Sequence, residues 1–213
     1  MKYFVGLDLG QAADFTALCV LEKISPAKPA YQVIRGSSWP EQGAKTYHLR
    51  HLERVKLGTP YPEIVSRARQ VMEALPKTGT FLIVDATGCG RPVFDMFKKE
   101  NLNPVGITIH GGGAVTRASG LINVPKRDLV GVLQVLFQSG RLKVAESLPD
   151  AKTFIDELLN FKVKINTKTA HDSYEAWREG IHDDLVLAVA LAAWYAEKKR
   201  PAARAIGKKP KGF

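Results

Sequence analysis

Two adjacent aspartates, Asp183 and Asp184, precede a long apolar run, residues 185–196. The run is apolar on every side of a helix, which predicts a helix that is packed on most of its faces. Carboxylates beside a core cost free energy unless a positive charge compensates them. The amide groups at the start of the helix offset part of that cost, and a metal ion can offset the rest. Asp is also a preferred helix N-cap, so this run alone leaves capping and metal binding open.

Two other aspartates end apolar strand patterns far upstream. Asp8 lies in the run 3–9, and Asp85 ends the run 80–85. Both runs predict central strands, and sites in open α/β sheets form beyond the carboxyl ends of such strands. The final helix would bring Asp183 or Asp184 to the same edge. Taken singly, each aspartate could instead cap a turn or accept a bond from a loop amide.

Taken together, these carboxylates predict a metal site. Three or four carboxylates that converge on one point repel each other unless cations lie between them, and ligation by oxygen alone favours Mg²⁺ or Mn²⁺. Two such ions about 4 Å apart can activate a water and stabilise the leaving oxygen of an in-line phosphodiester cleavage.

The elements that must position these acids follow from the hydrophobic pattern. We expect an α/β fold whose mixed sheet combines an antiparallel N-terminal three-strand meander with parallel strands, flanked by helices. The expected strands are 3–9, 15–22, 30–36, 80–85, 104–109 and 141–145, with 161–165 at an edge and 47–55 a strand or an extended arm. The expected helices are 61–75, 91–100, 126–139, 148–160 and 183–196, and a flexible loop is expected at 110–120.

The composition indicates a globular protein with an anionic partner. A chain of 213 residues can form one sizeable core, which we place at 1–199. The net charge is +10, and from Lys198 onward there are seven basic residues and no acid, so we expect 200–213 to be a disordered basic tail. This charge favours nucleic acid, although ribosomal contacts or a membrane surface would also fit.

The remaining composition gives no sign of secretion or of a structural metal. Two cysteines provide neither a disulfide framework nor a zinc pattern. The N-terminus runs directly into a strand pattern without a signal-peptide core, and the apolar run at 185–196 is too short to span a bilayer. We therefore expect a cytoplasmic protein that does not bind membranes.

Three motifs that contain these acids resemble one family. They are Gly6-Leu-Asp8-Leu-Gly10 with Asp14-Phe-Thr-Ala17, then Val84-Asp85-Ala-Thr-Gly88-Cys-Gly90, then Gly180-Ile-His182-Asp183-Asp184-Leu-Val-Leu-Ala188. Their order and spacing resemble the nuclease domain of phage terminase large subunits, over nearly the whole chain to about residue 199. That family has a ribonuclease-H-like fold and cuts packaged viral DNA with two divalent metal ions.

The resemblance implies specific roles. Asp8, Asp85 and Asp183 would be catalytic metal ligands, with Asp8 and Asp183 bridging or flanking two Mg²⁺ or Mn²⁺ ions and Asp85 holding one. Asp184 would be an additional or alternate ligand. Asp14 matches a recurring position of the family, and we expect it to order a loop. No organic cofactor is implied.

The chain departs from the family in lacking the P-loop of an ATPase motor. We therefore expect that it does not translocate DNA alone. It would be a stand-alone nuclease, a partner of a separately encoded packaging ATPase, small terminase subunit or portal, or a prophage remnant. In each case the partner would be double-stranded DNA in a bacterial host cell.

Basic residues are the candidates for DNA contact, although a solvated surface charge is the ordinary reading of each one. Lys126 resembles a basic position of the family that approaches a phosphate. The other candidates are Arg50, Arg54, Lys56, Arg91, Arg117, Arg127 and the tail.

Three other functions remain open from the sequence. Gly6–Gly10 also resembles the first phosphate loop of actin-like and sugar-kinase ATPases, with 110–113 as a later one. A Holliday-junction resolvase would share the fold and the acidic cluster. A DNA-binding or assembly protein could keep the fold without catalysis.

Overall fold

The computed structural model describes residues 1–10, 14–26, 44–88, 90–166 and 183–198. Its strands are β1 Lys2–Asp8, β2 Ala17–Ile24, β3 Thr46–Arg54, β4 Thr80–Asp85, β5 Val105–His110, β6 Thr116–Ala118, β7 Leu121–Pro125 and β8 Leu142–Val144. Its helices are α1 Tyr61–Glu73, α2 Gly90–Lys99, α3 Lys126–Gln138, α4 Ala151–Asn166 and α5 Asp184–Glu197.

Within this described part, the strands form one mixed sheet in the order β6-β7-β5-β4-β1-β2-β3-β8. β1, β2 and β3 pair antiparallel as a meander, and β4, β5 and β7 extend the sheet from β1 in parallel. The predicted fold class is confirmed. The third strand of the meander is β3, which pairs with β2 in the place expected for 30–36. β3 covers most of the segment 47–55, which was expected as a strand or an extended arm, and 30–36 lies outside the described residues.

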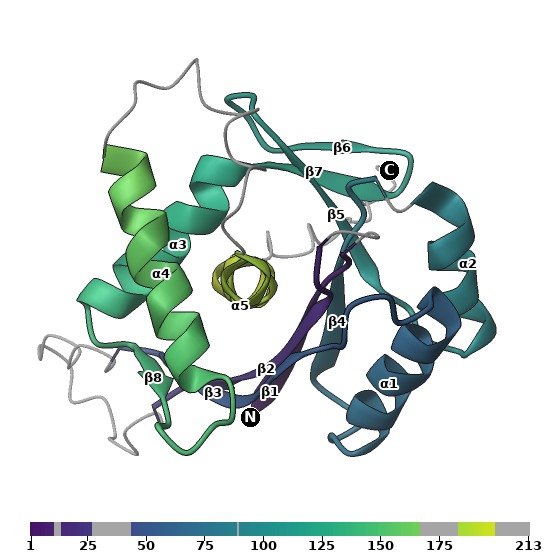
Figure 1. Ribbon diagram of the computed structural model, residues 1–213, viewed down its shortest axis with the longest axis horizontal. Helices are drawn as coiled ribbons and strands as arrows, with labels where there is room; N and C mark the ends of the chain where they lie inside the picture. Colours follow the sequence, from purple (N-terminus) through teal and green to yellow (C-terminus); the bar gives the residue numbers. More distant parts are fainter. Residues whose placement is uncertain (11–13, 27–43, 89, 167–182, 199–213) are drawn as a thin grey trace, which may run out of the picture.

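The helices cover both faces of the sheet (Figure 1). α3, α4 and α5 pack on one face, and α1 and α2 pack on the other. In this view α5 is seen end-on, enclosed between the sheet and the pair α3 and α4. Every residue of α5 from Asp184 to Trp194 is buried, as the all-round apolar pattern predicts.

Close contact between α5 and the sheet depends on a glycine. A Cβ on Gly6 of β1 would overlap the carbonyl oxygen of Ala188 and lie 3.1 Å from the Cβ of Ala192. From β2, the Sγ of Cys19 donates to the same Ala188 oxygen at 3.4 Å. Small residues on both surfaces therefore allow the α5 backbone to lie directly against β1 and β2.

Two local predictions were wrong. The expected loop at 110–120 contains a strand of the hairpin β6-β7, which turns at Ser119 and Gly120 with φ of 52° and 81°. A two-residue turn with positive φ at both positions suits the twist of a hairpin, and the Ser-Gly pair is the signal we missed. The expected edge strand at 161–165 is the end of α4, because the helix continues past Asn160 to Asn166.

Gly6→Ala tests the contact between β1 and α5. We expect the free energy of unfolding to fall by about 3 kcal/mol, the upper end of the usual cost of overpacking, because the added methyl group meets backbone. Urea denaturation followed by circular dichroism would measure this change.

Gly131→Ala is the matched control for Gly6→Ala. A Cβ at Gly131 in α3 meets nothing within 4 Å, so the same substitution should stabilise by up to about 1 kcal/mol through helix propensity. Equal effects of the two variants would contradict the close approach at Gly6.

Candidate active site

Two of the predicted acids end neighbouring parallel strands. Leu7 of β1 pairs with Val84 of β4, so Asp8 and Asp85 follow side by side at the carboxyl edge of the sheet. Both are buried, with 7% and 8% of their surfaces exposed. A carboxylate pair in this position is shielded from water, and therefore interacts strongly with any nearby charge.

A short turn holds Asp85 in place. The backbone N–H of Thr87 donates to Asp85 Oδ1 at 2.7 Å, which closes an Asx-type turn after β4. The Oγ1 of Thr87 in turn accepts from the Ile109 N–H of β5 at 2.8 Å. The Asp-Ala-Thr sequence thus orients the carboxylate and ties its loop to the next strand.

The start of α5 brings the other two acids to this region, and their side chains contact different cations. Asp183 Oδ2 lies 3.5 Å from the Nζ of Lys126, the first residue of α3. Asp184 Oδ2 lies 3.7 Å from Nη2 of Arg54, the last residue of β3. Asp184 is the more buried of the two, with 8% of its side chain exposed against 22% for Asp183.

Glu157 of α4 is a further buried carboxylate beside these four acids, and sequence reasoning missed it. Its Oε2 accepts from the backbone N–H groups of Leu185 and Val186, at 3.1 and 3.2 Å. Its Oε1 accepts from Arg54 Nη2. The signal that could have identified Glu157 is its place among the apolar positions of the helix, because Phe154 and Leu158, three residues before it and one after it, are also buried.

Burial and repulsion together disfavour the ionised form of Asp8. Burial raises its pKa well above the ordinary value, and the carboxylates of Asp85, Asp184 and Asp183 raise it further. A side-chain hydrogen bond joins Asp8 to Asp85. Burial also raises the pKa of Asp85, although the hydrogen bonds from Thr87 partly oppose this.

The residues around these acids are perturbed as well. Burial lowers the pKa of Lys126, while the neighbouring Asp183 carboxylate counteracts that shift. Burial raises the pKa of Glu157 to about 7, against the opposing effect of Arg54. Groups with such shifts that also lie together at one sheet edge are typical of functional sites.

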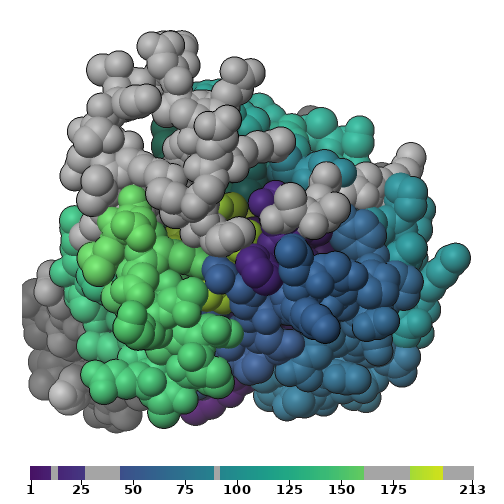
Figure 2. Space-filling model, in the orientation of Figure 1, coloured from purple at the N-terminus to yellow at the C-terminus, as the bar shows by residue number. Residues whose placement is uncertain are grey.

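Parts of the N-terminal segment and of α5 reach the surface on one face. In the space-filling view, purple atoms from the N-terminal part of the chain and yellow atoms of α5 are visible at the centre of this face, between green α4 and the blue of residues 44–75 (Figure 2). Among the described residues, no three His, Cys, Asp or Glu side chains are gathered tightly enough to hold a metal ion as they stand.

The predicted DNA-contacting residues occupy different environments. Arg117 is exposed on the edge strand β6, and Arg127 has 67% of its side chain exposed while its Nη2 donates to the Gly113 carbonyl at 2.7 Å. Lys126 is mostly buried beside Asp183. Arg91 lies in the first turn of α2, and its side chain is outside the described part. Arg54, another candidate, contacts buried carboxylates instead.

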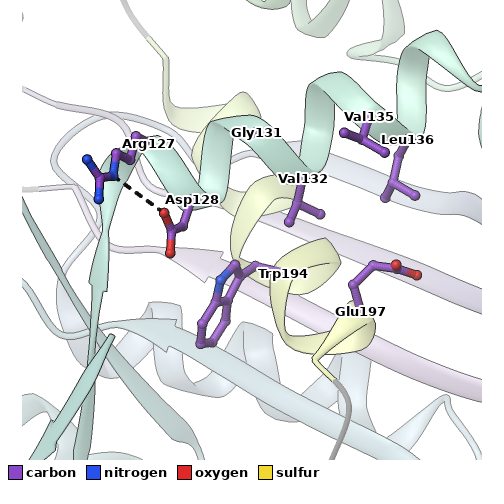
Figure 3. Close-up of a pocket in the computed structure, with 8 residues that line it drawn as sticks. All are labelled: Arg127, Asp128, Gly131, Val132, Val135, Leu136, Trp194 and Glu197. Carbon is purple, nitrogen blue, oxygen red and sulfur yellow. Dashed lines mark ion pairs between the residues drawn. The ribbon is translucent and has the colours of Figure 1, made fainter. Parts of the chain in front are cut away.

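A separate pocket lies along the seam between α3 and α5 (Figure 3). Its lining includes Trp194 and Glu197 at the far end of α5 from Asp184, about 15 to 20 Å away by helix rise. Arg127 and Asp128 form an ion pair of 3.7 Å at one end of it. This pocket contains none of the predicted catalytic acids.

Two solved structures resemble this architecture. The chain is similar to the large terminase nuclease from thermophilic phage G20c, with a TM-score of 0.50 and 20% identity over 93% of this chain and 83% of that one. It also matches T. thermophilus RuvC in complex with Holliday junction substrate, with a TM-score of 0.31 and 15% identity over 92% and 93% of the two chains. No protein-family model and no curated protein matches it.

The chain has a ribonuclease-H-like fold. This confirms the fold expected from the motifs, and the likeness to the G20c nuclease extends over almost the whole chain. The TM-score for RuvC is too low to add to this conclusion. None of the described helices is long and apolar enough to span a membrane.

Asp8→Asn should stabilise the metal-free ribonuclease-H-like fold at about pH 8. The pKa of Asp8 is higher in the folded than in the unfolded chain, so the folded state binds more protons above pH 3.8 and loses stability as the pH rises. Asn carries no charge, and its amide can donate to Asp85. Each 1 kcal/mol gained would raise the melting temperature by roughly 2–4 °C.

Thermal melts in EDTA across pH would test this prediction. The gain should shrink toward about pH 4, where Asp8 of the wild-type protein is itself protonated. A variant that is less stable than wild type at about pH 8, or a difference that does not change with pH, would contradict the repulsion inferred at this edge.

Proposed function

We propose that this protein is a metal-dependent DNA endonuclease that hydrolyses phosphodiester bonds. The observation that carries the proposal is the convergence of Asp8, Asp85, Asp183 and Asp184, from two strand ends and one helix start, at the carboxyl edge of a ribonuclease-H-like sheet. The perturbed pKa of Asp8 supports it, because the fold keeps a carboxylate where its charge is unfavourable.

The donor set suits hard divalent cations. The four acids supply only carboxylate oxygens, which Mg²⁺ and Mn²⁺ prefer, and a bound cation would relieve the repulsion that disfavours ionised Asp8. Asp8, Asp85 and Asp183 would hold two ions, with Asp184 as an additional or alternate ligand. When bound, such ions supply an activated water and charge stabilisation for the leaving oxygen.

Other residues beside these acids would orient the ligands and attract the substrate phosphate. Thr87 fixes the Asp85 carboxylate through its backbone N–H. Lys126 places positive charge 3.5 Å from Asp183 Oδ2, where it can attract a phosphate and limit repulsion before metal binds. The buried setting of Asp8 and Asp85 excludes water and strengthens these interactions.

Double-stranded DNA is the substrate class that we propose. A net charge of +10 favours a polyanion. The exposed Arg127 follows Lys126 at the start of α3, and the exposed Arg117 lies on β6, the outermost strand of the sheet. Phage DNA packaging beside a separate motor ATPase, small subunit or portal is the finer biological role that we propose. It is supported by the motif resemblance and by the fold likeness to the G20c nuclease.

Cleavage of supercoiled plasmid tests the nuclease activity and its site together. We expect nicking or linearisation with Mg²⁺ or Mn²⁺ and none with EDTA. Asp85→Asn should keep the fold but slow cleavage by more than about 100-fold, the upper end of losses from outer-shell changes, because it removes a ligand charge. Gel assays of initial rates would measure this.

Asp95→Asn serves as the matched control for Asp85→Asn. Asp95 is exposed on α2 and pairs only across one helical turn with Lys98, so its variant should cleave as wild type does. Full activity of Asp85→Asn would overturn the site assignment. A folded wild-type protein that cleaves with neither metal would overturn the proposed function.

The salt dependence of DNA binding tests the basic surface. Arg117→Gln should reduce the slope of log affinity against log salt by about 0.9, the value for one phosphate contact on duplex DNA. Lys98→Gln is the control, because Lys98 lies near the end of α2, away from the acidic edge. Fluorescence anisotropy with a labelled duplex would measure both, and equal slopes for wild type and Arg117→Gln would exclude this contact.

A further inference from the structure

The helix that carries Asp183 and Asp184 is capped by another helix. Asp183 occupies the N-cap position of α5, yet its side chain makes no capping hydrogen bond. The two amides that such a cap would satisfy, those of Leu185 and Val186, both donate to Oε2 of Glu157 on α4. Glu157 therefore accepts the capping hydrogen bonds that an N-cap side chain usually accepts. The Asp183 carboxylate lies near Lys126 instead.

Arg54 connects this cap to the second acid. Its Nη2 bonds to Oε1 of Glu157 and lies 3.7 Å from Oδ2 of Asp184. The guanidinium carbon lies 4.8 Å from the centre of the Phe15 ring. The backbone N–H of Arg54 donates to Asp150 at 3.1 Å. Arg54 is thus held from several sides between β3, α4 and α5.

The same contacts orient the two adjacent acids. The Asp183 side chain is drawn to Lys126 at the start of α3, and the Asp184 side chain is drawn to Arg54 at the end of β3. A helix start that was capped by Asp183 itself could not present both carboxylates in this way. The separation therefore depends on the external cap and on its arginine.

We propose that Glu157 and Arg54 are a pair of positioning residues that hold the first turn of α5, and with it Asp183 and Asp184, in the geometry that binds the metal ions. This inference rests on the proposed function and deepens it. Neither residue touches the metal or the DNA in this scheme. Groups that orient metal ligands in this way typically change metal affinity or activity by about 10–100-fold when they are removed.

Metal affinity, measured separately from activity, tests this role. Mn²⁺ would be titrated into the metal-free full-length protein by calorimetry for wild type, Glu157→Ala and Arg54→Ala. We expect each variant to bind Mn²⁺ about 10–100-fold more weakly. We also expect kcat for DNA cleavage to fall by a similar factor while KM for DNA stays within about threefold, because the DNA-binding surface is unchanged.

Two further variants separate positioning from general stability. Glu157→Gln keeps an oxygen that can accept from Leu185 and Val186, so it should bind Mn²⁺ more tightly than Glu157→Ala does. Asp156→Ala is the matched control, because Asp156 is the preceding residue of α4, exposed and paired with Lys152. It should match wild type in Mn²⁺ affinity and kcat.

The outcomes distinguish this inference from the function on which it rests. Faster hydrogen exchange at Leu185 and Val186 in folded Glu157→Ala, together with weaker Mn²⁺ binding, would support positioning. Wild-type Mn²⁺ affinity in folded Glu157→Ala and Arg54→Ala, with wild-type protein active, would overturn the inference alone. A wild-type protein that neither binds Mn²⁺ nor cleaves DNA would overturn the function and the inference together.

Discussion

The structure depends on how closely α5 lies against β1 and β2. Gly6 and the alanines of α5 let its backbone rest on β1, with the Ala188 carbonyl beside Cys19 of β2. Because the helix is fixed at this depth, its first turn reaches the same sheet edge as Asp8 and Asp85. A larger side chain at Gly6 would lift the helix and separate its acids from those of the strands.

Repulsion between the carboxylates at this edge explains the cations that lie beside them. Several carboxylates share a mostly buried edge, and two cations in the described part of the chain lie in contact with them. Lys126 contacts Asp183, and Arg54 contacts Glu157 and Asp184. Natural proteins keep such unfavourable groupings where function requires them, and local stability is lost as a result.

Local sequence pattern predicted the placement of part of the candidate site. Asp8 and Asp85 each end an apolar strand, and parallel pairing alone makes them neighbours. Glu157 could not be assigned in this way, because its partners are backbone amides of a helix 28 and 29 residues later. In the sequence, Arg54 resembled a surface base. Its acidic partners are distant along the chain, and only folding brings α4 and α5 to the end of β3.

The buried strands and α5 were predicted better from the sequence than the hairpin at the edge of the sheet and the end of α4. Buried strands and α5 carry patterns that the core enforces, whereas β6 and β7 depend on a two-residue turn and the end of α4 has no clear stop signal. Asp183 combines a predictable and an unpredictable feature. Its place at the start of a helix follows from the local sequence, but the orientation of its side chain depends on Glu157, which accepts the capping hydrogen bonds instead. A motif can therefore identify an acid, while its chemistry is decided by contacts that the motif does not contain.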